Sequence, residues 1–141
     1  MSETLDNLVR YYETLTRESV HDLPRYYTQD AFFKDPFNEV RGLDKIIPIF
    51  EHMYDQVLEP RFIITERVSA ENGVFLVWDF EFRMRRFKPQ QKQTIRGVTH
   101  LRFAQDGRVN YHRDYWDAAE ELYEKLPLVG SLMRWFKKQA G

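Results

Sequence analysis

The residues of this chain that could do acid–base chemistry are a few carboxylates set among apolar neighbours. Asp35 follows Ala31, Phe32 and Phe33 and precedes Pro36. A carboxylate in apolar surroundings has its charged form disfavoured, so its pKa rises and it can exchange protons near neutral pH. This pattern predicts Asp35 as a catalytic acid or base. An Asp before a Pro also commonly caps a turn, and that structural role is the alternative interpretation.

A second group of candidates lies on the strand predicted at 108–116. If Trp116 faces the interior, then Asn110, His112 and Asp114 face it too, because strand side chains alternate with a period of two. The outward residues would then be Val109, Tyr111, Arg113 and Tyr115. Polar groups on an inward face are costly to bury. His112 and Asp114 are therefore predicted as acid–base groups, and a hydrogen-bonded pair that only braces the sheet is the alternative.

The composition and the absence of certain motifs exclude several classes of site. The chain has 141 residues, a formal net charge of −1 and no cysteine. This balance gives no general attraction to nucleic acid or anionic membranes, and it excludes disulfides and thiolate metal sites. Asp35, His112 and Asp114 have no recognised ligand spacing, so no metal is expected. No glycine-rich phosphate loop or nucleophilic serine elbow is present, and no cofactor is expected.

The expected location is the cytoplasm. The first residues, Met-Ser-Glu-Thr-Leu-Asp, lack the basic and apolar regions of a signal peptide. No apolar run reaches the roughly 18 residues that a membrane span requires.

Hydrophobic periodicity places the candidate residues on an α+β framework. Helical spacing of apolar residues occurs in three early segments, at 5–15, 19–27 and 43–57, with Pro24 in the first turn of the second helix. A short strand at 31–33 lies between the second and third helices. Alternation then predicts four further strands, at 61–69, 74–86, 93–103 and 108–116. Helices followed by strands predict an antiparallel meander packed against the helices.

Residues 27–44 resemble a signature of the NTF2-like superfamily, which includes the SnoaL-like cyclases and ketosteroid isomerases. The segment contains an aromatic residue, Asp-Ala, an apolar strand ending in Asp-Pro, and a glycine that opens the next helix. The resemblance implies an α+β cone in which three N-terminal helices pack in a strongly curved antiparallel sheet with one open mouth. The NTF2-like domain would span 1–117, and 118–141 would form a C-terminal helical extension.

The resemblance also implies roles for individual residues. In ketosteroid isomerases the Asp of the Asp-Pro step shuttles the proton, and a Tyr in an Arg-Tyr step of the first helix donates to the enolate oxygen. Asp35 and Tyr11 occupy these places; the other interpretation of Tyr11 is a core residue. Thr99 stands where the family has a protonated Asp as second donor, which departs from the family pattern. SnoaL-like cyclases use an Asp on a late strand as acid or base, and Asp114 is the candidate here.

An apolar cone implies a small, mostly apolar ligand rather than a nucleotide. The ligand-binding residues predicted for it are Trp116, Asn110, Thr99, Phe33, Phe50 and Tyr54. One interpretation of the chain is a cofactor-free enzyme of the isomerase, cyclase or dehydratase kind, which transfers a proton next to a carbonyl group. In this interpretation Asp35 is the base, and Tyr11, His112 or Asp114 is the donor or acid. The other is a non-catalytic ligand-binding or dimerisation domain of the same fold.

Two further expectations concern surfaces. The outer face of the sheet should mediate a homodimer, because it would carry the mixed apolar set Val98, His100, Val109, Tyr111 and Tyr115. In the extension, the short helix with Leu132, Trp135 and Phe136 should fold back near the mouth of the cone. A basic amphipathic helix of this kind can also lie on a membrane, which is the alternative.

Overall fold

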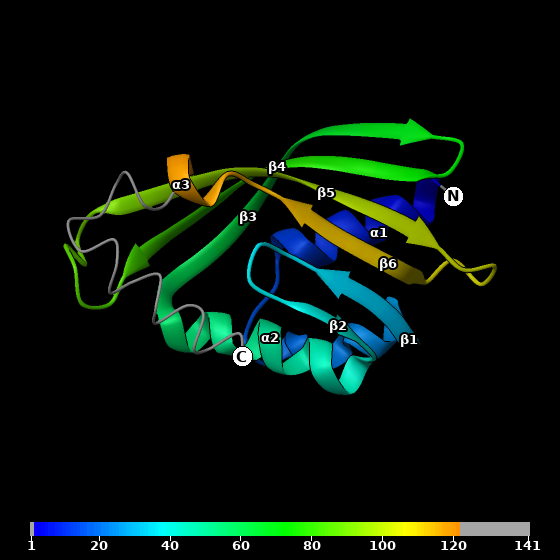
Figure 1. Cartoon of the computed structure of the whole chain (residues 1–141), viewed down its shortest axis with the longest axis horizontal. Coiled ribbons are helices and arrows are strands. Elements are labelled where there is room, and N and C mark those ends of the chain that lie inside the picture. Colours follow the sequence, from blue (N-terminus) through cyan, green and yellow to red (C-terminus); the bar gives the residue numbers. More distant parts are fainter. Residues whose placement is uncertain (1, 122–141) are drawn as a thin grey trace.

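The computed structural model describes residues 2–121 (Figure 1). Of the predicted C-terminal extension it describes only the start, the short helix α3 (Ala118–Glu121). The expectation for Leu132, Trp135 and Phe136 falls outside the described residues.

Six strands occur in residues 2–121, and all belong to one sheet. They are β1 (Tyr27–Lys34), β2 (Glu39–Arg41), β3 (Val57–Ala70), β4 (Gly73–Met84), β5 (Lys92–Phe103) and β6 (Val109–Tyr115). Their order is β2-β1-β6-β5-β4-β3. The long strands β3, β4 and β5 bend along their length, so the sheet is strongly curved (Figure 1).

The sheet is mixed rather than antiparallel, which corrects the sequence-based prediction. Neighbouring strands run antiparallel except β1 and β6, which pair in parallel, with Phe33 opposite His112. Parallel neighbours need a long crossover connection. Here α2 and the β3–β5 meander supply this connection, so β1 and β6 lie side by side inside the sheet. This pairing brings the Asp35 segment beside β6.

The helices precede most of the sheet, but they are not three regular helices in succession. α1 (Ser2–Glu13) and α2 (Leu43–Gln56) are α-helices near the predicted positions, whereas η1 (Ser19–Arg25) is a 3₁₀ helix. Pro24 lies near the end of η1 and not in its first turn, which corrects the predicted position. β1 and β2 separate η1 from α2.

The predicted glycine before α2 has a clear structural reason. Gly42 has a φ of 105°, a backbone conformation that favours glycine because it lacks a Cβ. Its N–H donates to the carbonyl oxygen of Ala31 at 2.8 Å. This bond ties the start of α2 to β1 and fixes the path of the connection that carries Asp35.

Strand boundaries differ from the prediction where the chain is irregular. β3 begins at Val57, before Pro60, whereas the sequence pattern placed the strand after it. The ladder between β3 and β4 shifts register between Leu58 and Arg61, and Glu59 has a φ of 51°. A bulge of this kind accommodates a proline within a strand, because the missing N–H falls outside the regular ladder.

The main core lies between the helices and the inner face of the sheet. Leu8 of α1, Ile46 of α2, Leu76 of β4 and Leu101 of β5 are almost fully buried within it. Each such side chain contributes roughly 1.5–3 kcal/mol to folding when removed from water. A second, smaller cluster contains Trp78, Phe82 and Ile95, with Trp116 packed against it. His112 contacts Phe33 and Phe50 of the main core, whereas Thr99 contacts Trp78 of the second cluster.

Candidate active site

Polar side chains hold both ring nitrogens of the buried His112. Its Nδ1 lies 2.6 Å from the hydroxyl oxygen of Tyr27 on β1, and its Nε2 lies 2.8 Å from Oδ1 of Asp114 on the same strand. The Tyr27 hydroxyl in turn lies 2.5 Å from the hydroxyl of Tyr12 on α1. The predicted pairing of His112 with Asp114 is therefore present, within a longer chain that starts on the first helix.

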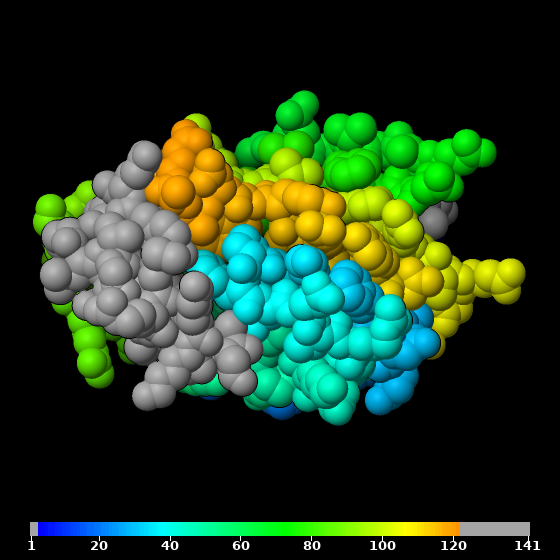
Figure 2. Space-filling model, viewed as in Figure 1, coloured from blue at the N-terminus to red at the C-terminus, as the bar shows by residue number. Residues whose placement is uncertain are grey.

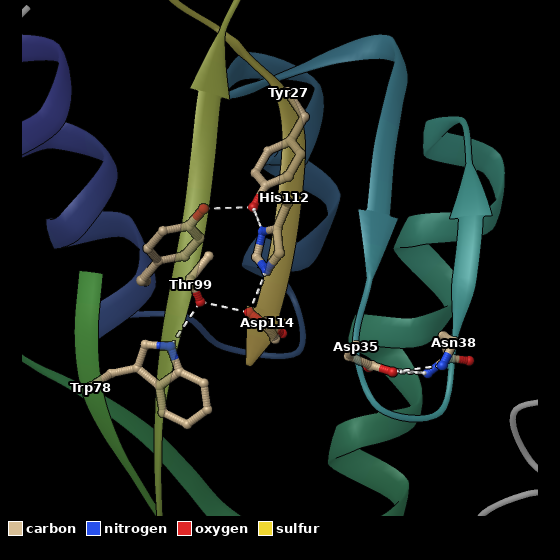
Figure 3. A network of polar contacts seen from close by, with 8 residues as sticks. Tyr27, Asp35, Asn38, Trp78, Thr99, His112 and Asp114 are labelled. Carbon is tan, nitrogen blue, oxygen red and sulfur yellow. Dashed lines mark hydrogen bonds and ion pairs between the residues drawn. The ribbon is translucent and has the colours of Figure 1, made fainter. Parts of the chain in front are cut away.

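A second branch reaches the same carboxylate from the other side. The Thr99 hydroxyl on β5 donates to Asp114 Oδ1 at 2.5 Å, and the Trp78 indole N–H on β4 donates to Thr99 Oγ1 at 2.7 Å. Gly97 makes room for this arrangement, because a Cβ there would lie 2.4 Å from the Trp78 ring. Figure 3 shows the line of contacts from Tyr27 through His112 and Asp114 to Thr99 and Trp78.

Aromatic residues surround the imidazole. The Phe33 ring centroid lies 4.7 Å from that of His112, and the Phe50 ring meets it edge-on at 6.3 Å. Burial raises the pKa of the Tyr12 and Tyr27 hydroxyls, so both keep their protons at neutral pH. The hydrogen-bonded series therefore runs from two neutral tyrosine hydroxyls through an imidazole to one carboxylate.

Asp35 lies on the β1–β2 connection, apart from this chain (Figure 3). Its Oδ1 accepts the backbone N–H groups of Phe37 and Asn38 at 2.8 and 2.6 Å, and the Asn38 amide approaches both carboxylate oxygens at 3.1 Å. Burial raises the pKa of Asp35 and the Asp114 carboxylate raises it further, while these hydrogen bonds oppose the rise. Asp35 therefore caps its own turn and also has the perturbed acidity predicted from the sequence.

The two carboxylates share an open hollow of about 550 Å³. It is lined by Lys34, Asp35, Pro36, Arg113, Asp114, Tyr115, Trp116 and Asp117. Figure 2 shows the surface on which the β1–β2 segment, in blue to cyan, meets β6, in orange. Asp114 is 19 % exposed. Among the described residues its Oδ2 has no hydrogen-bond partner, so this oxygen is available to a ligand.

Two predicted site residues lie elsewhere. The Tyr11 hydroxyl donates to the carbonyl oxygen of Ser19 at 2.7 Å and its ring stacks on Tyr26, so it belongs to the core packing of η1. Asn110 is exposed and lines a separate hollow at the opposite end of the strand. Val109, predicted to point outward, is fully buried. A register shift in the β5–β6 ladder, at Arg102 and Phe103, breaks the alternation of β6 near its start.

The predicted ligand-binding aromatics are dispersed. Phe33 and Phe50 pack around His112 within the core. Tyr54 is half-buried on α2, where burial raises its pKa to about 12, and Arg17 lies over its ring. Trp116 lines the hollow and packs edge-on against Phe37 at 5.7 Å.

Three residues of the hydrogen-bond network around Asp114 were not identified from the sequence. Tyr12 was passed over for its neighbour Tyr11, although both lie on the apolar side of α1. Tyr27 was assigned to a helix, whereas it begins β1. Trp78 was given no role in the sequence-based prediction. Its proximity to Thr99 follows from the β4–β5 register, in which Leu76 is opposite Thr99 and Trp78 opposite Gly97.

Within residues 2–121, no cluster of three or more His, Cys, Asp or Glu side chains could hold a metal ion. Across the same residues, no helix has the length and apolar character needed to cross a membrane.

Three solved structures illustrate what the fold resembles. A protein from Shewanella putrefaciens assigned as a SnoaL-like polyketide cyclase has 26 % identity and a TM-score of 0.68, over 86 % of this chain and 97 % of that one. An LEH-like epoxide hydrolase from M. tuberculosis has 16 % identity and a TM-score of 0.70, over 96 % and 94 %. A hypothetical protein with a ketosteroid isomerase-like fold from Catenulispora acidiphila, in complex with trimethylamine, has 13 % identity and a TM-score of 0.70, over 85 % and 89 %.

No curated protein sequence matches the chain. The sequence profile of the SnoaL-like domain, in contrast, matches residues 8–112. This span begins in α1, includes Tyr12, Tyr27, Asp35 and Thr99, and ends at His112. Together with the curved mixed sheet and its helices, it shows that this chain belongs to the SnoaL-like domain family of the NTF2-like fold.

Proposed function

We propose that this protein is a cofactor-free enzyme that transfers a proton on a small, mostly apolar carbonyl compound bound in the hollow between β1–β2 and β6. The observation that carries the proposal is the Asp114 carboxylate. One of its oxygens is held by His112 and Thr99, while the other is unpaired among the described residues and lies on a ligand-sized hollow. A carboxylate fixed in this way is oriented as a base before the ligand arrives.

The two carboxylates suit different roles. Two hydrogen bonds hold Asp114 Oδ1 in place and leave Oδ2 on the hollow, so we assign Asp114 as the base. Burial raises the pKa of Asp35, so we assign Asp35 as the proton donor. This assignment reverses the sequence-based expectation, in which Asp35 was the base.

The tyrosine donor expected from ketosteroid isomerases is also replaced in this proposal. Tyr11 is engaged with Ser19, so it does not serve the site. A protonated Asp35 would stabilise the enolate oxygen instead, and Trp116 would pack against the apolar part of the ligand. The trimethylamine complex and the cyclase and epoxide hydrolase relatives support small-molecule binding by this fold.

Hydrogen–deuterium exchange tests this function directly. The protein is incubated in D₂O with a panel of small apolar ketones, 1,3-dicarbonyl compounds and steroid enones, and loss of the α-proton signal is followed by NMR. We expect exchange at least about 100-fold above the buffer rate for some members, as general base catalysis provides. Asp114→Asn should remove that excess. The proposal is wrong if ketones that bind the protein exchange no faster than in buffer.

The alternative function, a dimerisation or ligand-binding domain without catalysis, is favoured by a row of rings on the outer face of the sheet. Phe32 stacks on Tyr111 at 5.3 Å, Tyr111 meets His100 at 5.3 Å, and His100 stacks on Phe75 at 4.3 Å. These four residues, the aromatic row, come from four adjacent strands. A continuous half-buried aromatic surface of this kind is typical of a protein interface.

We propose that the aromatic row forms a homodimer interface. Light scattering at micromolar concentration should give about twice the mass of 17.1 kDa. Tyr111→Glu should return the protein to monomer, because a buried unpaired charge at an interface is costly. Val68→Glu is the matched control, since Val68 is 50 % exposed at the far edge of the sheet. A monomeric mass for the unchanged protein would contradict the dimer without affecting the proton-transfer proposal.

A further inference from the structure

The hydrogen bonds that lead to Asp114 can be given directions by counting protons. Trp78 has an indole N–H that only donates, so Thr99 accepts from it and donates its own hydroxyl proton to Asp114. On the other branch, three hydrogen bonds connect Tyr12, Tyr27, His112 and Asp114. Two neutral hydroxyls and a neutral imidazole provide three protons, one for each bond.

One direction satisfies every group. Tyr12 donates to Tyr27, Tyr27 donates to Nδ1 of His112, and Nε2–H of His112 donates to Asp114. In this arrangement each bond contains one proton and Asp114 is an anion. Each hydroxyl and ring nitrogen of the chain then has a role compatible with its chemistry.

The opposite direction leaves a buried donor without an acceptor. If Nδ1 of His112 carried a proton, Tyr27 would accept it and would have to donate to Tyr12. The Tyr12 hydroxyl, which is buried, has no second partner among the described residues. An unpaired buried donor is costly. The same difficulty arises for a doubly protonated imidazole, because Nδ1–H would again reverse both tyrosines.

We infer that His112 is a neutral Nε2–H imidazole, fixed in that tautomer by Tyr27 and Tyr12, and that it positions Asp114 rather than exchanging protons with a ligand. This inference deepens the proposed function and rests on it for its chemical meaning. The groups packed against the ring are Tyr12, Tyr27, Phe33 and Phe50, and Asp114 supplies the charge. Asp35 is a further titratable group near the site, and it interacts electrostatically with Asp114.

The direction of the chain limits the reaction that the site can perform. When a C–H bond of the ligand breaks, its proton forms an O–H bond at Asp114 Oδ2, and the electron pair stays on the ligand as an enolate. The proton cannot continue through His112, because Nε2 already carries one and Nδ1 already accepts one. It must return to the ligand from within the hollow. The site is therefore suited to isomerisation or ring closure, in which the ligand keeps its proton count.

The tautomer can be measured without any substrate. Two-bond ¹H–¹⁵N correlation of the ¹⁵N-labelled full chain at about pH 7.5 distinguishes a protonated ring nitrogen from an unprotonated one. The resonances of His112 are assigned by elimination with the variants His21→Gln, His52→Gln and His100→Gln, because these three histidines take no part in the hydrogen bonds that lead to Asp114. We expect a protonated Nε2 and an unprotonated Nδ1. The inference is overturned if Nδ1 is protonated in the unchanged protein, either alone or together with Nε2.

Tyrosine variants then test what fixes the tautomer. Tyr27→Phe should move the Nδ1 resonance downfield, because that nitrogen loses its donor, while Nε2 remains protonated. Tyr11→Phe is the matched control, because Tyr11 is a buried tyrosine whose hydroxyl donates to Ser19 and not to His112, and it should move neither resonance. An unchanged Nδ1 in Tyr27→Phe would overturn the inference. If Tyr27→Phe does not fold, the tautomer of the unchanged protein decides. Failure of ketone exchange would refute the proposed function and leave the tautomer result standing.

Discussion

Asp35 and Asp114 lie on the same hollow but are held by different kinds of partner. Asp35 is bound mainly by its own turn, through backbone N–H groups two and three residues ahead. Asp114 is bound by side chains of His112 and Thr99, and these are supported from β1, β4 and α1. A local turn can be formed by a short segment, whereas the support of Asp114 exists only in the assembled sheet. The comparison indicates that Asp114 is the more specifically positioned of the two carboxylates.

The largest expected effect is on turnover. Asp114→Asn should lower the exchange rate of any ketone substrate by roughly 10²–10⁴-fold, because the amide cannot act as a base. Asp35→Asn should cause a smaller loss, because an amide can still donate a hydrogen bond to the ligand. Single-turnover exchange kinetics of both variants measure the difference. Equal losses, or a larger loss in Asp35→Asn, would reverse the assigned roles.

The next effect is on stability. Thr99→Val removes a donor to Asp114 and leaves the buried Trp78 indole N–H without its acceptor. We expect a loss of about 1–3 kcal/mol in the free energy of unfolding, measured by urea titration. Thr65→Val is the control, because its exposed hydroxyl donates to a backbone carbonyl at 3.2 Å. Similar losses in both variants would show that the support of Asp114 is no stronger than a surface contact.

Asp35 should show its effect through pH. Its pKa is raised in the folded protein, so between the ordinary Asp pKa and the raised one the folded state binds more protons than the unfolded state. Its contribution to stability is present at low pH and is lost as pH rises through that window. Asp35→Asn should therefore gain stability relative to the unchanged protein as pH rises from about 3.5 to 7. A constant difference in urea midpoint over this range would contradict the raised pKa.

The smallest effect concerns the turn itself. Asn38→Ala removes the side-chain amide that contacts both Asp35 oxygens and keeps the backbone N–H. Because that amide stabilises the charged carboxylate, its loss should raise the pKa of Asp35 further. Carboxyl ¹³C titration by NMR measures the shift, with Asp106, which lies on a distant turn, as an internal reference. A lower pKa for Asp35 in Asn38→Ala would mean that the amide does not stabilise its charge.

Much of the fold follows from local pattern. The helix over the first residues, the glycine before α2, the β3–β4 hairpin and the long strands were all predictable, because amphipathic periodicity and turn chemistry act over a few residues. The β1–β6 parallel pairing was not predictable from these signals. It depends on which distant strands meet, and local alternation does not encode that choice. The break in alternation near Val109 was not predicted for a similar reason, because a bulge depends on the partner strand.

The sequence by itself was enough to select Asp35, His112 and Asp114 as candidate acid–base groups, because carboxylates and imidazoles are unusual on strand faces predicted to point inward. Thr99 was selected through the family resemblance. The tertiary structure decided what these residues do together. Tyr12 and Tyr27 reach His112 because α1 and β1 pack against β6, and Trp78 reaches Thr99 because β4 pairs with β5. Hydrogen bonds form only within about 3 Å, and such distances between residues far apart in the chain are set by packing.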